Sequence, residues 1–198
     1  GLLPVGTAID YEGVGTMSKS KNNGVDPQAL IAKYGADTAR IYTMFTAPPE
    51  ATLEWNDAAV EGSYRFLRRV WNFGARLADL PQAATPVTRL GKATTDLRRE
   101  VHTVLKQVDY DYQRMQYNTV VSGVMKMLNA LEDFKNDGSA GSNVAVREGF
   151  GMLLRSMYPA TPHIAHTLWA ELGFAAQQGD LLDALWPKID DTALVQDE

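Results

Sequence analysis

Apolar side chains recur at helical spacing through most of the chain beyond residue 55. Within residues 56–79, Val60, Tyr64, Leu67 and Trp71 follow one another at steps of four, three and four, and a second apolar set lies beside them. An apolar stripe this wide is typical of an amphipathic helix that packs against more than one neighbour. The same period predicts four further helices, over residues 96–112, 118–134, 144–158 and 162–172.

Polar segments separate these helices. Residues 81–95 are rich in proline and threonine and predict a loop, whereas residues 137–143 read DGSAGSN and predict a flexible linker. Residues 174–198 have weak periodicity, and we expect mostly irregular structure there. Amphipathic helices joined by short connections form antiparallel bundles. The predicted fold class is therefore mainly α, with an antiparallel helical bundle over residues 51–198.

The first 50 residues follow a different pattern. Residues 1–25 are rich in glycine and have no helical period, so we expect a loop with one short extended piece around Thr7–Tyr11. A short helix follows, because Asp26 precedes Pro27 as an N-cap and Gly35 closes it. We predict that residues 1–50 form a unit separate from the bundle.

A second helix of this unit is also marked by its ends. Asp37 is a suitable N-cap, and the helix ends near Ala47 because Pro48 and Pro49 cannot continue it.

Composition narrows the class of protein. The 198 residues are 45% hydrophobic and include no cysteine, so a packed core is possible but disulfides and thiolate metal sites are not. The chain has no apolar run of membrane-spanning length and no signal-peptide pattern. Its formal net charge is −5, whereas a dedicated nucleic-acid module is usually basic, so any nucleic-acid binding must come from a local patch.

The string MSKSKNNGVDP over residues 17–27 carries the most chemical information. It is a polar loop with two lysines, and the glycines around it permit positive φ. Ser18 and Ser20 offer hydroxyl and backbone donors and Lys19 offers an ammonium group, a combination that suits a polyphosphate. The alternative is a solvated loop in which these residues only keep the chain soluble.

The longer string favours the first interpretation, because it resembles a family signature. MSKS is the core of the KMSKS signature of class I aminoacyl-tRNA synthetases, and MSKSKNNGVDP is similar to the leucyl branch in particular. The resemblance continues through YGADTAR (34–40), APPEATLEWN (47–56), EGSYRFLRRVW (61–71) and TPHIAHTLWAELG (161–173).

This resemblance implies an enzyme that activates leucine with ATP and transfers it to tRNA(Leu). Residues 1–50 would be the end of its Rossmann catalytic domain with the MSKS loop, and residues 51–198 its helical anticodon-binding domain. ATP is expected as a substrate together with Mg²⁺. The intact protein is expected to be a cytoplasmic monomer that does not bind membranes.

The resemblance also assigns roles within the loop. The second lysine of the signature falls on Lys19, the expected catalytic residue, which stabilises negative charge on the α-phosphate and the departing pyrophosphate. Met17, Ser18 and Ser20 would complete the ATP-binding loop. The first lysine of the signature is replaced by Thr16, so Lys19, alone or together with Lys21, must carry more of the charge.

Other parts of the family pattern lie outside this sequence. We find no His-x-Gly-His string for the HIGH motif, and neither a doubly wound sheet nor an editing domain. The sequence begins with Gly1 rather than methionine. We therefore expect a carboxy-terminal fragment that does not aminoacylate tRNA by itself.

Basic residues gather on the polar sides of two predicted helices and form the candidate tRNA-binding surface. They are Arg65, Arg68, Arg69 and Arg76 on the first helix, and Arg98, Arg99 and Lys106 on the second. Such side chains would contact backbone phosphates and position an RNA without reading its sequence. For any single arginine, a solvated helix face is the simpler explanation.

Two smaller groups of residues have simpler interpretations. His163 and His166 lie three residues apart, but without cysteine or an obvious third ligand we expect capping or packing roles and predict no metal site. The four tryptophans are expected to anchor the core.

Two alternative functions stay open. The first is the same machinery acting on valine or isoleucine, although those enzymes typically read Lys-Gly-Asn-Val where this chain has residues 21–24, Lys-Asn-Asn-Gly. The second is a non-enzymatic helical module that binds RNA or protein and keeps the loop as a relic. Amino-acid-dependent pyrophosphate exchange tests the first alternative, and an upstream HIGH motif in the parent gene tests the second.

Overall fold

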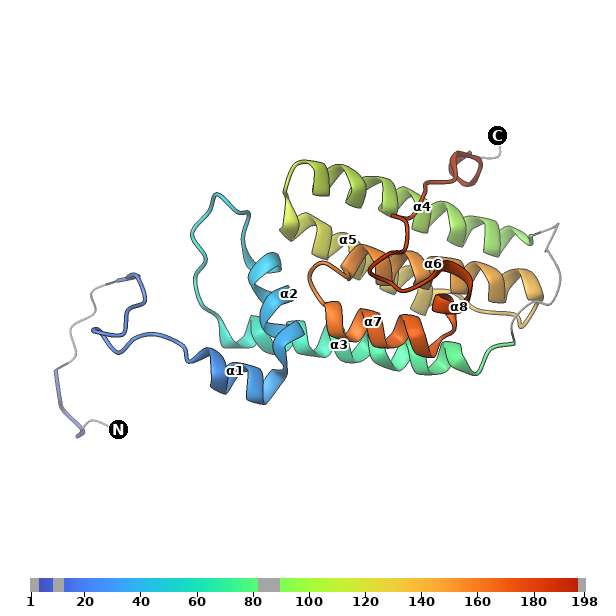
Figure 1. Ribbon diagram of the computed structural model, residues 1–198. Coiled ribbons are helices and arrows are strands. Elements are labelled where there is room, and N and C mark those ends of the chain that lie inside the picture. The colour runs from blue at the N-terminus through green and yellow to red at the C-terminus, as the bar shows by residue number, and fades with distance from the viewer. Residues whose placement is uncertain (1–3, 9–12, 82–89, 196–198) are drawn as a thin grey trace.

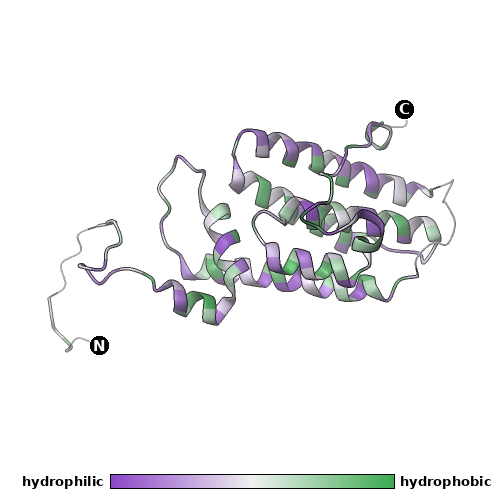
Figure 2. Ribbon diagram, in the orientation of Figure 1, coloured by the Kyte–Doolittle hydropathy of each residue, from purple (hydrophilic) through white to green (hydrophobic). Residues whose placement is uncertain are grey.

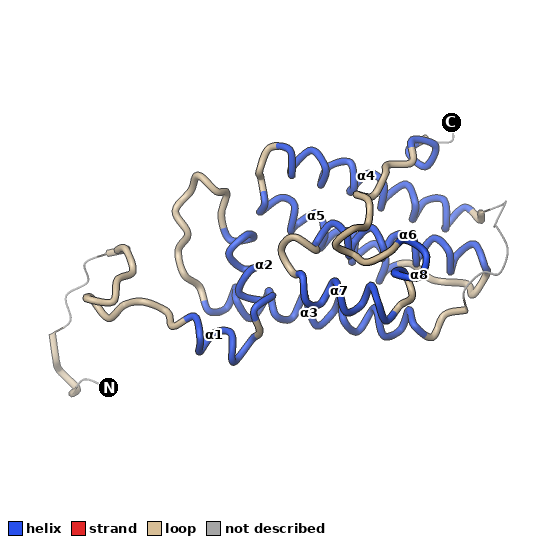
Figure 3. Tube along the Cα trace, in the orientation of Figure 1, coloured by secondary structure: helices blue, strands red, loops and turns tan. Residues whose placement is uncertain are grey.

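Helices are the regular elements in the computed structural model, which describes residues 4–8, 13–81 and 90–195 (Figure 3). They are α1 (Pro27–Tyr34), α2 (Ala36–Thr46), α3 (Asp57–Ala78), α4 (Lys92–Gln113), α5 (Tyr117–Asp133), α6 (Ala140–Met157), α7 (Pro162–Glu171), α8 (Phe174–Gln178) and the 3₁₀ helix η1 (Asp191–Leu194). The prediction of a mainly α fold is confirmed. No helix within the described ranges is long and apolar enough to cross a membrane.

The long helices α3 to α7 lie side by side as a bundle (Figure 1). Helix α4 packs on α5 and α6, whereas α3 packs on α2 and α7, so α4 and α3 form opposite edges. Hydrophilic and hydrophobic positions alternate along each long helix (Figure 2), as the period of the sequence requires. The fully buried core includes Leu105 of α4, Leu128 of α5 and Leu153 of α6.

A glycine sets the close approach of α4 and α5. A Cβ atom added at Gly123 of α5 would lie 2.6 Å from Cγ2 of Val108 on α4. Gly123 is therefore needed for close packing rather than for backbone freedom, which accounts for a poor helix former in the middle of a helix.

Helix α2 shares the core of the bundle. It packs on α3 and α5, and Ile41 and Tyr42 are both 1% exposed. The Tyr42 hydroxyl accepts a hydrogen bond from the Asn56 backbone N–H at 3.0 Å, which ties α2 to the start of α3. The expectation that residues 1–50 pack as a separate unit is therefore wrong for α2. The functional division at residue 50 stays a prediction.

Several helix ends lie where the capping residues in the sequence predicted them. Asp26 accepts a hydrogen bond from the Gln28 N–H at 3.0 Å, Asn56 accepts one from the Ala59 N–H at 3.0 Å, and Gly173 follows α7 at φ 80°. The extended piece expected at Thr7–Tyr11 lies mostly outside the described residues.

Two helices begin about one turn earlier than expected. Helix α4 starts at Lys92 rather than Asp96, because the Asp96 carboxylate pairs with Lys92 and Arg99 instead of capping the helix. Its first turn is held on α6 by a 3.0 Å hydrogen bond between the buried hydroxyls of Thr94 and Ser142.

Helix α6 starts at Ala140, inside the segment that we expected to be a flexible linker. Ser139 caps it by accepting a hydrogen bond from the Ser142 N–H, and Asp137 accepts one from the Ser139 N–H at 2.9 Å. Asn143 is 2% exposed, and its amide oxygen accepts a hydrogen bond from Asn136 at 2.9 Å. The small polar residues therefore form a capping structure rather than a linker.

The carboxy-terminal segment is also more ordered than expected. It contains α8 and η1, and Leu181 and Ala193 are buried. The Asp190 N–H donates to Nδ1 of His102 at 3.1 Å, and Arg99 donates to the Val195 carbonyl at 3.1 Å. These contacts hold the segment against α4.

Candidate functional sites

The MSKS segment is a compact exposed turn that lies beyond α1, away from the bundle (Figure 1). Asn23 closes the turn, because its side chain accepts a hydrogen bond from the Ser18 N–H at 2.8 Å and donates one to the Thr16 carbonyl at 3.3 Å. The Asn22 N–H donates to the Lys19 carbonyl at 3.1 Å, and Asn22 itself has a φ of 51°. The two asparagines therefore shape the turn.

From the sequence, these asparagines indicated only the leucyl branch, and their part in shaping the turn was not predicted. The signal was present, because asparagine adopts positive φ more readily than other residues with side chains, and its amide often bonds to nearby backbone.

The serines of the turn bond to one another. The hydroxyls of Ser18 and Ser20 lie 3.2 Å apart, and Ser18 Oγ accepts a hydrogen bond from the Lys21 N–H at 3.2 Å. Lys19, Lys21 and Met17 are exposed. Within the described residues, no carboxylate lies within 4 Å of either lysine ammonium group, so the turn presents two positive charges for an anion.

The α3 arginines differ in how far their charges are already paired. Arg69 bonds to Glu132 and, at 2.7 Å, to Asn129, both on α5. Arg76 lies 3.9 Å from Glu132. Arg65 and Arg68 are exposed, and no described carboxylate forms an ion pair with them. These two cations are the most available on α3 for a phosphate.

The α4 candidates differ in the same way. Arg98 makes hydrogen bonds of 2.6 and 2.9 Å to Glu148 and of 2.8 Å to Asp190, and its side chain is 20% exposed. Arg99 pairs with Asp96 at 2.9 Å. Lys106 is exposed, without an ion pair to any described carboxylate.

Arg98 is the centre of a partly buried network that sequence reasoning did not predict. Burial raises the pKa of Glu148, but hydrogen bonds from Arg98 and His102 outweigh it and hold that pKa at about 2. The hydrogen bonds that Arg98 donates to Glu148 and Asp190 raise the pKa of Arg98. Asp190 lies in the segment that we expected to be mostly irregular, but it belongs to this network because the segment folds back onto α4.

The basic residues therefore form two sets. Arg65, Arg68, Arg69 and Arg76 lie along α3, whereas Arg98, Arg99 and Lys106 lie along α4 at the opposite edge of the bundle (Figure 1). A single patch that combines both helices, as the sequence suggested, is not what the fold forms. The part of each residue in RNA binding stays a prediction.

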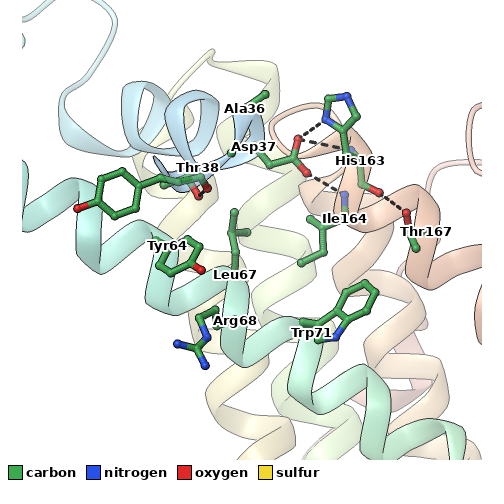
Figure 4. A pocket seen from close by; sticks show the side chains of 12 residues that line it. Ala36, Asp37, Thr38, Tyr64, Leu67, Arg68, Trp71, His163, Ile164 and Thr167 are labelled. Carbon is green, nitrogen blue, oxygen red and sulfur yellow. Dashed lines mark hydrogen bonds and ion pairs between the residues drawn. The ribbon is translucent and has the colours of Figure 1, made fainter. Parts of the chain in front are cut away.

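A groove of about 550 Å³ lies beside the α3 set, between α2, α3 and α7 (Figure 4). Tyr64, Leu67, Arg68 and Trp71 form its α3 wall. Trp71 is 43% exposed, so the expectation that all four tryptophans anchor the core is wrong for it. Trp186 is also partly exposed, whereas Trp169 is buried as expected.

The opposite wall of the groove contains Asp37 and His163, for which the structure changes one expectation. Asp37 does not cap its own helix, whose N-cap is Gly35. Its carboxylate instead accepts hydrogen bonds from the backbone of α7, at 2.8 Å from the Ile164 N–H, and faces Nδ1 of His163 at 2.7 Å (Figure 4). Such a partner is distant in sequence, so the local pattern could not reveal it.

The two histidines of α7 have separate carboxylate partners. His163 faces Asp37, and His166 Nε2 lies 2.9 Å from Asp180. Among the described residues, no three histidine, aspartate or glutamate side chains gather in a way that would hold a metal ion.

Two families match this sequence. Residues 95–198 match the family described as the anticodon-binding domain of tRNA ligase, and residues 2–56 match the class I tRNA synthetases for I, L, M and V. The first match spans more than half of the chain, α4 to η1. The second match includes the MSKS turn, α1 and α2.

Similar proteins extend this result over the whole chain. Leucine–tRNA ligases are 71% identical in Delftia acidovorans and 72% identical in Acidovorax sp., each over 100% of this chain. The leucine–tRNA ligase of Polaromonas sp. is 73% identical over 97% of this chain. The chain spans only 22–23% of the length of these relatives.

One solved structure supports the fold. LeuRS of Agrobacterium radiobacter K84, crystallised as a ternary complex with tRNA and LeuAMS, superposes with a TM-score of 0.77 at 23% identity. The superposition covers 90% of this chain and 23% of that protein.

Proposed function

We infer that this chain, which belongs to the class I tRNA ligases and contains their anticodon-binding domain, forms part of a leucine–tRNA ligase. The intact protein would activate leucine with ATP and transfer it to tRNA(Leu). The observation that carries this proposal is the 71–73% identity to leucine–tRNA ligases, which extends from the MSKS turn through the bundle.

The MSKS turn would contribute electrostatic stabilisation rather than acid–base chemistry. Lys19 is exposed on a turn that Asn23 holds closed. Among the described residues, no carboxylate forms an ion pair with its ammonium group. Directed at the α-phosphate and departing pyrophosphate, this ammonium group would stabilise the charge that develops during adenylate formation. Met17, Ser18 and Ser20 would border ATP, while Thr16 offers a hydroxyl where the family signature has lysine.

ATP would bring Mg²⁺ with it, but the part of the chain that the structure describes offers no set of ligands for the ion. The described residues contain no cluster of three acidic or histidine side chains. We therefore assign no residue to Mg²⁺ and derive no step from it. We further propose that the intact ligase acts as a monomer in the cytoplasm.

The α3 set would hold the tRNA body. Arg65 and Arg68 have the most available charges, and Arg68 lines the open groove, so we propose these two residues as the first phosphate contacts. Arg69 and Arg76 would join them if the RNA displaces Glu132. On α4, Lys106 is the most available cation, and Arg98 and Arg99 are held by carboxylates.

Reversing both free charges of α3 tests this surface. In the intact protein, Arg65→Glu with Arg68→Glu should weaken tRNA(Leu) binding by about tenfold or more at moderate salt and make the slope of log K against log salt shallower by roughly two. Filter binding or fluorescence anisotropy over a range of salt concentrations measures both quantities.

A charge-matched control separates this effect from the loss of net positive charge. Arg114→Glu with Lys188→Glu makes the same charge change at two exposed positions away from α3, and the salt slope should stay close to wild type. If the α3 variant keeps the wild-type slope, or if both double variants lose affinity equally, the α3 set is an ordinary solvated face.

A further inference from the structure

Two side chains of α2 hold the corner between α6 and α7, although more than a hundred residues separate them from that corner in the sequence. Asp37 and Arg40 lie three residues apart and therefore project from one side of α2. Asp37 binds the first turn of α7, and Arg40 binds the two carbonyls that follow α6. We call these two residues the α2 clamp.

Asp37 supplies what the start of α7 lacks. The N-cap residue Thr161 makes no side-chain cap, because its hydroxyl donates to the Met157 carbonyl at 3.0 Å, and Pro162 has no N–H. The Asp37 carboxylate, 8% exposed, accepts hydrogen bonds from the Ile164 N–H at 2.8 Å and the His163 N–H at 3.4 Å. A carboxylate at this position also complements the positive end of the helix dipole.

Arg40 completes the clamp on the other side of the corner. Its Nε donates to the Ala160 carbonyl at 3.0 Å, and Nη2 donates to the Pro159 carbonyl at 2.8 Å. These carbonyls follow the carboxy-terminal end of α6, where a cation complements the helix dipole. One turn of α2 therefore binds the ends of two bundle helices. The negative Asp37 meets the amino-terminal end of α7, and the positive Arg40 meets the carboxy-terminal end of α6.

The clamp acts on the end of α2 that carries the MSKS turn. Ile41 and Tyr42 seat the middle of α2 in the core, but Asp37 is only two residues from Gly35, where the chain turns into α1 at a φ of 85°. Helix α1 has no buried residue of its own, and its Tyr34 touches the bundle through an edge-on contact with Tyr64, 5.5 Å between ring centroids. The direction of α1 therefore depends on how the start of α2 is held.

We propose that Asp37 and Arg40 are positioning residues that fix the direction in which α1 and the MSKS turn leave the bundle. The catalytic importance of this positioning rests on the proposed function. If the direction of α1 is fixed, Lys19 is brought to ATP while the bundle holds tRNA.

Distances between spin labels test the clamp directly on this chain. The sequence has no cysteine, so cysteines introduced at the exposed positions Gln28 on α1 and Lys126 on α5 are the only labelling sites. Double electron–electron resonance should give one narrow distance distribution for the otherwise unchanged chain. Asp37→Ala should broaden or shift it, and Asp37→Asn, which keeps one acceptor oxygen, should have a smaller effect.

Two controls make this result specific to the clamp. Asp180→Ala removes the other aspartate–histidine pair of α7, an exposed one that does not involve α2, and should leave the distribution unchanged. A second label pair, at Lys126 on α5 and Lys188 in the carboxy-terminal segment, does not include α1 and should be unaffected by all three variants. If Asp37→Ala lowers the melting temperature but leaves the Gln28–Lys126 distribution as in the parent, the clamp is only a source of stability and the proposal is wrong.

The intact protein gives a separate, functional result. Asp37→Ala should lower the kcat of leucine-dependent pyrophosphate exchange by roughly ten- to a hundredfold, with tRNA affinity retained, because a small misplacement of a charge-stabilising group is costly. If Asp37→Ala shifts the Gln28–Lys126 distance but leaves kcat unchanged, the clamp orients α1 without contributing to catalysis. Absence of exchange in the parent protein would instead contradict the proposed function, while the distance measurement still decides whether the clamp orients α1.

Discussion

Replacing Lys19 with alanine in the intact protein should lower the rate of leucine-dependent ATP–pyrophosphate exchange by about a hundred- to a thousandfold. The reason is that this ammonium group is exposed, has no described carboxylate partner and lies on a turn whose backbone is held by Asn23. With threonine at position 16, no neighbouring signature lysine can replace it. The affinity for tRNA(Leu) should change little, because the turn lies away from the bundle (Figure 1).

Lys21→Ala is the matched control for this variant. It removes the same charge from the same turn, two residues away, and we expect a much smaller loss of exchange activity. Asn23→Ala should lie between the two, because it removes the hydrogen bonds to Thr16 and Ser18 but leaves Lys19 in place. An exchange rate within a few-fold of wild type for Lys19→Ala would show that this lysine has no such role.

Arg98→Ala should destabilise the fold by roughly 3 kcal/mol, since removing one partner of a partly buried ion pair leaves the other without compensation. Arg98 is 20% exposed and Glu148 is 29% exposed, so water reduces but does not remove the penalty. The variant also removes the ion pair between α4 and the Asp190 carboxylate, which leaves the hydrogen bonds of His102 and Arg99 to hold the carboxy-terminal segment. Chemical denaturation of this chain measures the loss.

The same network predicts how stability depends on pH. Glu148 has a pKa of about 2 in the folded chain, below the value of about 4.3 expected when it is unfolded. A carboxylate with a depressed pKa stabilises the fold above its unfolded pKa, and that contribution is lost as the pH falls through the folded value. We therefore expect stability to decline between about pH 4.5 and pH 2, and Glu148→Gln to flatten that decline.

Arg65→Ala is the comparison for the Arg98 variant. Arg65 is exposed and has no described ion-pair partner, so its removal should leave the free energy of unfolding nearly unchanged. If Arg98→Ala is as stable as Arg65→Ala, the network does not hold α4, α6 and the carboxy-terminal segment together.

The sequence predicted the fold well where local signals decide it. The apolar period identified α3 to α7, and the caps at Asp26 and Asn56 gave the starts of α1 and α3. It failed where a distant residue decides. The first turn of α4 is held by the hydrogen bond between Thr94 and Ser142, and Asp37 caps α7 rather than its own helix. No window of neighbouring residues contains that information.

The candidate sites follow the same rule. The MSKS turn was recognisable from its own residues, because its shape depends on hydrogen bonds within positions 16–23. The availability of each arginine was not, because it depends on carboxylates that are distant in sequence. Arg98 meets Glu148 fifty positions later, and Arg69 meets Glu132 sixty-three positions later. Arg65 and Arg68 have no such carboxylate partner among the described residues, and only the folded structure reveals this difference.

Pyrophosphate exchange by the intact protein with leucine, valine and isoleucine in turn decides whether this protein activates leucine. We expect ATP–pyrophosphate exchange with leucine that strongly exceeds exchange with the other two amino acids, and its loss in Lys19→Ala. Preferential exchange with valine or isoleucine, or none with any of the three, would contradict it.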